Sequence, residues 1–143
     1  MKFSDQDRFE FWLMEMNDSI RRFLDSLPEE VARQLEFSVD SLTCLELWLI
    51  SRYQGPVEIM RPTEAQVHDG AARYIGETFR RSLGGKWRID FLDKKNVYFG
   101  VPQIVDMQGQ MAQFCPYALV TTLLDRRRGD FLVSIFRALD SNR

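Results

Sequence analysis

Hydrophobic positions recur with a helical period through the first part of the chain. Between residues 5 and 27 they return every three or four positions, which predicts one long amphipathic helix. Its apolar stripe consists of Phe9, Trp12, Leu13, Met16, Ile20, Phe23, Leu24 and Leu27. Ser4 is the expected N-cap, because a serine hydroxyl accepts a hydrogen bond from the first helical turn. Phe11 and Met14 fall outside the stripe, and we expect a neighbouring helix to cover them.

Two further helices are predicted before residue 55. Pro28 favours the start of a short helix over residues 29–35, because proline suits the first helical turn. The next helix, residues 40–53, has Ser38 or Asp40 as its N-cap and is apolar on most sides. A helix of that kind is expected to be covered on several faces.

The most regular helix is predicted over residues 63–83, and we call it the central helix. Thr63 and Gln66 fit a capping box, in which each side chain bonds the backbone N–H of the other residue. The apolar positions along it recur every four residues, which gives it one buried line. A pair of glycines after residue 83 ends it.

After the central helix the hydrophobic period changes to two. Apolar and polar residues alternate over 87–91 and again over 97–101, which predicts two strands joined by a polar turn. A third strand is expected near residues 103–107. The segment from about 86 to 107 therefore predicts a small antiparallel sheet.

Two helices are predicted to close the fold. Pro116 begins one that runs to about Arg127, and Asp130 caps one that runs to about Leu139. β-branched residues within 118–136 leave a hairpin as the alternative, although we favour helices. The elements together predict a single α+β domain over residues 1–143: N-terminal helices, the central helix, a small sheet and C-terminal helices.

Charge is unevenly distributed along the chain. Residues 1–60 carry 6 basic and 12 acidic side chains, whereas residues 61–143 carry 13 basic and 9 acidic ones. One interpretation is that the two halves dock and partly neutralise each other; the other is that one half offers a charged face to a partner. The formal net charge of −2 leaves no global basic field, so we expect no nucleic-acid partner.

Residue types that carry chemistry are few. A metal site is not expected, because the chain has one histidine, His68, and no C-x-x-C pair. No phosphate-binding glycine loop and no nucleophile elbow occur, so no cofactor and no catalytic residue are predicted. Cys44 is expected to be buried, and His68 to be solvated or locally bonded. Cys115 precedes a helix start, where the dipole would lower its thiol pKa, although a tucked-in apolar role explains it as well.

Cysteine content and hydrophobicity also indicate where the protein is located. Two cysteines do not make a disulfide framework, and the polar start of the chain is not a signal peptide. No apolar run approaches the roughly 20 residues that span a bilayer. We therefore expect a cytoplasmic protein with no membrane partner.

One face of the central helix is polar. Its residues are Gly70, Arg73, Tyr74, Glu77 and Arg81. Arg73 and Glu77 are spaced for an ion pair, and Arg73, Tyr74 and Glu77 are candidate partner-binding residues. Glycine inside a helix costs about 1 kcal/mol relative to alanine, so Gly70 and Gly76 predict close approach of another backbone. The structural interpretation of this face is a central helix that leads into the first strand.

The central helix also carries a pattern that resembles small bacterial domains of unknown function. The pattern is G-A-x4-G-E from Gly70, followed by L-G-G-x-W that ends at Trp87. Residues 35–53 add to this resemblance, which covers about half of the chain and implies no activity. In general character, small acidic α+β proteins of this kind are similar to the immunity proteins of bacterial toxin systems.

These observations favour a non-catalytic protein-binding domain of immunity or regulatory type. The acidic segment of residues 5–30 is the preferred face, with Glu10, Glu15 and Asp18 as candidate contacts for a basic protein. A homodimer is also compatible with the sequence. The alternative is a small-molecule-binding protein or minor enzyme with a pocket between the sheet and the central helix.

Overall fold

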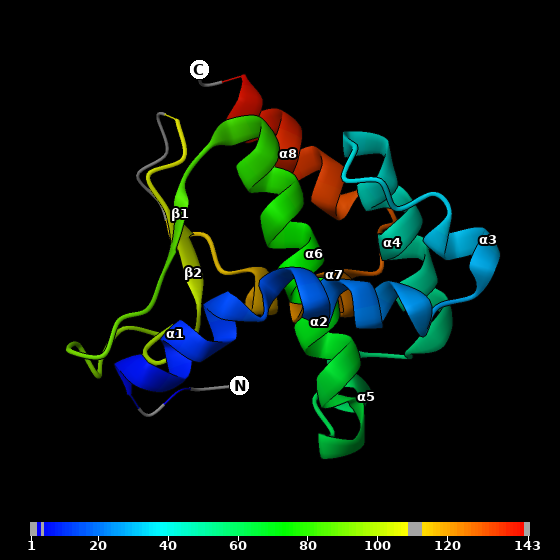
Figure 1. Cartoon of the computed structure of the whole chain (residues 1–143). Helices are drawn as coiled ribbons and strands as arrows, with labels where there is room; N and C mark the ends of the chain where they lie inside the picture. Colours follow the sequence, from blue (N-terminus) through cyan, green and yellow to red (C-terminus); the bar gives the residue numbers. More distant parts are fainter. Residues whose placement is uncertain (1–2, 4, 109–112, 142–143) are drawn as a thin grey trace.

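Helix α6 (Ala65–Leu83) is the element around which the fold is built. The computed structural model describes residue 3 and residues 5–108 and 113–141. Eleven of the nineteen residues of α6 are buried, including Tyr74 and Phe79 with no exposed surface. Helix α2 (Met16–Asp25) packs on the front of α6 in Figure 1, and α7 (Pro116–Arg126) packs behind it. The central position expected for this helix is confirmed.

The other helices enclose this core. They are α3 (Glu29–Ala32), α4 (Val39–Arg52), α5 (Pro56–Ile59), the 3-10 turn η1 (Pro62–Glu64) and α8 (Phe131–Asp140). Helix α8 packs against α4 on the right of Figure 1, whereas the small sheet lies on the left. The expected α+β class, with C-terminal helices rather than a hairpin over 118–136, is confirmed.

The N-terminal segment differs from the single long helix that we expected. Helix α1 (Gln6–Met14) ends before Glu15, whose φ of −89° and ψ of 8° leave the helical region, and α2 starts in a new direction. Asp5 caps α1, since its carboxylate accepts the backbone N–H of Arg8 at 2.9 Å. Ser4, the predicted cap, lies outside the described residues. The bend lets the apolar stripes of both helices reach α6.

Local signals at other helix ends had mixed success. Ser38 caps α4 as predicted, because its Oγ accepts the backbone N–H of Ser41 at 3.2 Å. Thr63 is not a cap, since it lies within η1 before α6 begins. At the start of α8 the cap is not Asp130 but the distant Glu46. Its fully buried carboxylate accepts the N–H groups of Phe131 and Leu132 at 3.0 and 2.8 Å.

The sheet pairs the first predicted strand with the expected third strand, and not with the second. Strand β1 (Lys86–Arg88) runs antiparallel to β2 (Gln103–Val105), with Trp87 opposite Ile104. Residues 97–101, the predicted hairpin partner, lie in turns instead. The reason is a loop over residues 90–100 that folds around Asp90, whose carboxylate accepts from Leu92 N–H at 2.9 Å and Asn96 Nδ2 at 2.9 Å. Because of this loop, the first segment that reaches β1 is β2, which begins at Gln103.

The two glycines inside α6 are contacted by side chains and not by a second backbone. A Cβ at Gly70 would overlap the ring of Phe23, and one at Gly76 would overlap the ring of Trp87. The Ile104 side chain also reaches within 3.1 Å of that position at Gly76. Trp87 and Ile104 therefore fill the space between the sheet and α6, where the sequence placed a candidate pocket.

We expect Gly76→Leu to lower the free energy of unfolding by at least about 1 kcal/mol, because the new side chain must displace Trp87. Denaturant melts of the purified protein measure this change. Gly55→Ser is the control, since nothing lies within 4 Å of a Cβ at Gly55. Equal stability of the two variants would contradict the close packing at Gly76.

Candidate functional site

A buried polar cluster joins α1, α6 and α7, and its hub is the carboxylate of Asp69. Oδ1 of Asp69 accepts hydrogen bonds from the Trp12 indole at 2.9 Å and from the Tyr117 hydroxyl. Oδ2 accepts from Nε of Arg73 at 2.7 Å. We call Trp12, Asp69, Arg73 and Tyr117 the Asp69 cluster. One carboxylate thus ties together residues that are up to 105 positions apart.

Arg73 is held in this cluster through two nitrogens of its guanidinium, Nε and NH1. Its side chain is 4% exposed, and NH1 donates to the carbonyl oxygen of Trp12 at 2.8 Å. The guanidinium also lies 4.2 Å from the Trp12 ring centroid, as a cation–π contact. Asp69 neutralises the buried charge, so Arg73 is not displayed to a partner.

The predicted polar face of the central helix is therefore mostly internal. Tyr74 is fully buried, and its hydroxyl hydrogen-bonds Ser41 Oγ at 2.6 Å. Glu77 does not pair with Arg73, as its spacing had predicted. It accepts from Arg80 NH1 at 2.8 Å and from the Trp87 indole at 2.9 Å. These contacts hold β1 against α6, so the face has a structural role in the free protein.

His68 is buried against α7, whereas the sequence predicted a solvated or locally bonded side chain. Its Nε2–H donates to the carbonyl oxygen of Tyr117 at 3.1 Å. Burial lowers the pKa of His68, because desolvation penalises the imidazolium. Burial also raises the pKa of Tyr117 well above its ordinary value. Both side chains are thus held neutral at pH 7.

We expect His68 to make the protein less stable as pH falls below about 6.5, the ordinary pKa of histidine. The unfolded chain then binds a proton that the folded chain does not, so protonation favours unfolding. His68→Gln retains a donor for Tyr117 and does not titrate in this range. Denaturant melts at about pH 7 and pH 5 should show that the free energy of unfolding falls less for the variant than for the wild type. Parallel losses in both proteins would contradict this assignment.

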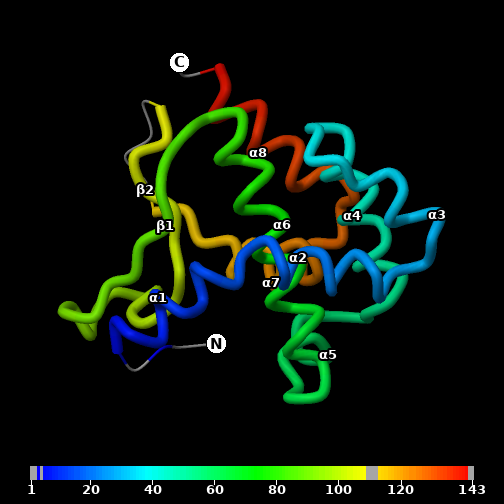
Figure 2. Tube along the Cα trace, in the orientation of Figure 1, coloured from blue at the N-terminus to red at the C-terminus, as the bar shows by residue number. Residues whose placement is uncertain are grey.

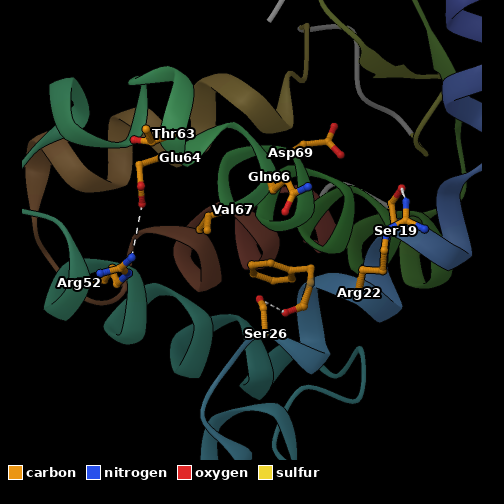
Figure 3. Close-up of a pocket in the computed structure, with 10 residues that line it drawn as sticks. Ser19, Arg22, Ser26, Arg52, Thr63, Glu64, Gln66, Val67 and Asp69 are labelled. Carbon is orange, nitrogen blue, oxygen red and sulfur yellow. Dashed lines mark hydrogen bonds and ion pairs between the residues drawn. The ribbon is translucent and has the colours of Figure 1, made fainter.

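A polar pocket of about 230 Å³ opens beside the cluster, between α2, the end of α4 and the start of α6. Figure 3 shows Arg52 with Glu64 on one side of the pocket and Arg22 with Ser19 on the opposite side. Oε1 of Glu64 accepts from the Tyr53 hydroxyl at 2.6 Å, which lowers the pKa of Glu64. Asp69 also reaches this pocket. Its mixed charges suit a small polar molecule.

The candidate acidic contacts lie on the surface. Glu10 and Asp18 are exposed, while Glu15 is half-buried and pairs with Arg22 at 3.3 Å. Phe11 and Met14 are 62% and 81% exposed, so the expectation that a neighbouring helix covers them is wrong. Sequence periodicity had flagged both residues as lying outside the buried stripe. That was the signal for an apolar surface on α1.

A shallow depression lies on this same side of α1. It has a volume of about 400 Å³, and aromatic and charged residues line it: Phe3, Asp7, Arg8, Phe11, Trp12, Glu15 and Arg73. We call it the α1 depression. Unlike the polar pocket, it offers mainly apolar surface to whatever docks there.

Of the two thiols, Cys115 has the tucked-in environment that was expected as one alternative, whereas Cys44 differs from its expected full burial. Cys44 is half-buried and not fully covered, whereas Cys115 is buried at the start of α7. Burial raises the pKa of the Cys115 thiol, which outweighs any lowering by the helix start. Within residues 5–108 and 113–141, no group of histidine, cysteine and acidic side chains is arranged to hold a metal ion. In the same residues, no helix has the length and apolarity to cross a membrane.

Comparison with known proteins found no family model that matches the chain, no curated protein of similar sequence and no solved structure of similar fold.

Proposed function

We propose that this chain is a non-catalytic protein-binding domain that docks a basic protein on the exposed face of α1 and α2. The observation that carries the proposal is the uncovered pair Phe11 and Met14, on a helix whose acids Asp7 and Glu10 are also exposed. An apolar centre with charged residues around it is the usual anatomy of a protein interface.

The face also suits charge-guided association. Glu10 precedes Met14 by one helical turn, so acid and apolar groups lie on one side of α1. A basic partner would be attracted before contact, and the apolar side chains would then be buried. An immunity or regulatory protein of a bacterial toxin system fits this description, since an acidic face can cover the basic site of a nucleic-acid-cleaving enzyme. The two free cysteines fit a cytoplasmic location.

The proposal is tested with a partner captured on the full chain from the native host and then purified. Its association rate should fall steeply between about 50 and 500 mM salt, as the Debye length shrinks from over 10 Å to under 5 Å. Glu10→Lys, Glu15→Lys and Asp18→Lys together should slow association more than they speed dissociation. A salt-independent association rate, or docking wholly on residues 61–143, would contradict the proposal.

A matched control reverses three acids elsewhere. Glu36→Lys, Asp125→Lys and Asp140→Lys change the net charge by the same amount on other surfaces. This variant should keep most of the wild-type association rate if the α1–α2 face is the docking site. Circular dichroism of both variants establishes that they remain folded.

The polar pocket supports a second candidate function, the binding of a small polar molecule. Its opposed Arg22 and Arg52 and its carboxylates would suit a ligand that carries both charges. A metabolite screen by thermal shift tests this candidate. A ligand that still raises the melting temperature of the Arg52→Ala and Arg22→Ala variants would not occupy this pocket.

A further inference from the structure

The loop over residues 90–100, which we call the Asp90 loop, is ordered by its own hydrogen bonds. The Asp90 carboxylate accepts the backbone N–H groups of Leu92 and Asp93 at 2.9 and 3.1 Å. The carbonyl oxygen of Asp90 accepts Gly100 N–H at 2.9 Å, which closes the loop. These bonds, together with Phe91 and Tyr98, which pack against the core, give the loop a fixed shape.

The tip of this loop displays apolar side chains to solvent. Leu92 is 95% exposed and Val97 is 75% exposed. A leucine held almost fully in water by an ordered loop is a ready anchor, because little conformational entropy is lost when it docks. Lys94 and Lys95 lie two and three residues after Leu92 and are exposed as well.

The α1 depression is complementary to this tip in chemistry. Phe3, Phe11 and Trp12 in its lining suit a leucine side chain, and the carboxylates of Asp7 and Glu15 in the same lining suit the two lysines. Arg8 in the lining matches Asp93, which follows Leu92, and Arg73 in the lining is already neutralised by Asp69.

The tip and the depression lie at the same end of the molecule. Phe3 N–H donates to the carbonyl oxygen of Gly100 at 2.7 Å, which ties the base of the loop to the segment before α1. Figure 2 shows the loop extending beyond α1 on this side. A contact that uses both features can therefore be exchanged between two copies around a two-fold axis.

We propose that the occupant of the α1 depression is Leu92 of a second copy of this chain, so that the protein forms a symmetric homodimer. Each copy supplies one Asp90 loop and one depression, and each lysine pair meets Asp7 and Glu15 of the other copy. The inference does not depend on the proposed function, although a basic partner that docks on Phe11 would compete with the second copy. A dimer would be seen in the purified protein with no partner present.

Sedimentation of the full chain tests the dimer over concentrations from about 1 to 300 µM, the range in which a small interface dissociates. The wild type should shift from monomer to dimer. Leu92→Ser should weaken the dimer at least about tenfold, because the buried leucine is lost. Val57→Ser is the control. Val57 is likewise an exposed apolar residue, at 75%, but it lies on α5 and not on the Asp90 loop.

Charge exchange between copies gives a sharper test. Variant one carries Lys94→Glu and Lys95→Glu; variant two carries Asp7→Lys and Glu15→Lys. Each alone places like charges at both contacts and should stay monomeric. An equal mixture restores opposite charges at both contacts of a mixed dimer, so the dimer should reappear in the mixture only.

Three results would overturn the proposal. They are a wild type that stays monomeric throughout, a dimer that Leu92→Ser and Val57→Ser weaken equally, and variants that fail to pair when mixed. The loop substitutions leave Glu10, Glu15 and Asp18 intact. Salt-dependent binding of a basic partner by Leu92→Ser would therefore uphold the proposed function even if the dimer fails.

Discussion

Asp69→Ala should lower the free energy of unfolding by about 3–5 kcal/mol, because it leaves the guanidinium of Arg73 buried without its anion. The Trp12 indole and the Tyr117 hydroxyl lose an acceptor in the same substitution. Urea melts of the purified protein measure the loss. Asp18→Ala, which removes an exposed acid, should change stability by no more than about 0.5 kcal/mol.

A second substitution separates the buried charge from the other contacts. Arg73→Met added to Asp69→Ala removes the unpaired cation and should recover part of the lost stability. The recovery would be incomplete, since Trp12 and Tyr117 no longer have the carboxylate of Asp69 as an acceptor. A double variant that is less stable than Asp69→Ala would show that Arg73 contributes through packing and not through its charge.

Glu46→Ala should cost about 2–4 kcal/mol, because the N–H groups of Phe131 and Leu132 then lose their acceptor inside the protein. The negative charge at the positive end of α8 is lost as well. Glu46→Gln keeps one acceptor oxygen and should be intermediate. Glu36→Ala, an exposed acid just before α4, is the control. Equal free energies of unfolding for Glu46→Ala and Glu36→Ala would exclude a role for Glu46 as the cap of α8.

Asp69 and Glu46 have roles that local sequence patterns do not predict. Glu46 lies on an apolar helix, and the backbone N–H group of Phe131 that it caps is 85 residues away. Asp69 sits one turn before Arg73, yet the spacing rule paired Arg73 with Glu77 because that pair also fits a helix. The three-dimensional contacts with Trp12 and Tyr117 chose Asp69, and no local pattern contains them.

The candidate site was also predictable only in part from the sequence. Glu10, Glu15 and Asp18 could be named from charge alone, and periodicity marked Phe11 and Met14 as lying off the buried stripe. Whether those two residues were covered depended on which helices pack beside α1. The polar pocket and the α1 depression join residues from separate elements, so spacing along the chain contains no sign of either.

Helix positions and class could be predicted because their causes are local. The apolar period of α6, the Ser38 cap and Pro116 at the start of α7 act within a turn or two of the chain. The bend at Glu15, the pairing of β1 with β2 and the capping of α8 by Glu46 depend on contacts between distant segments. Such contacts are selected by burial and by satisfaction of polar groups in the packed chain, and these exist only once the helices have assembled.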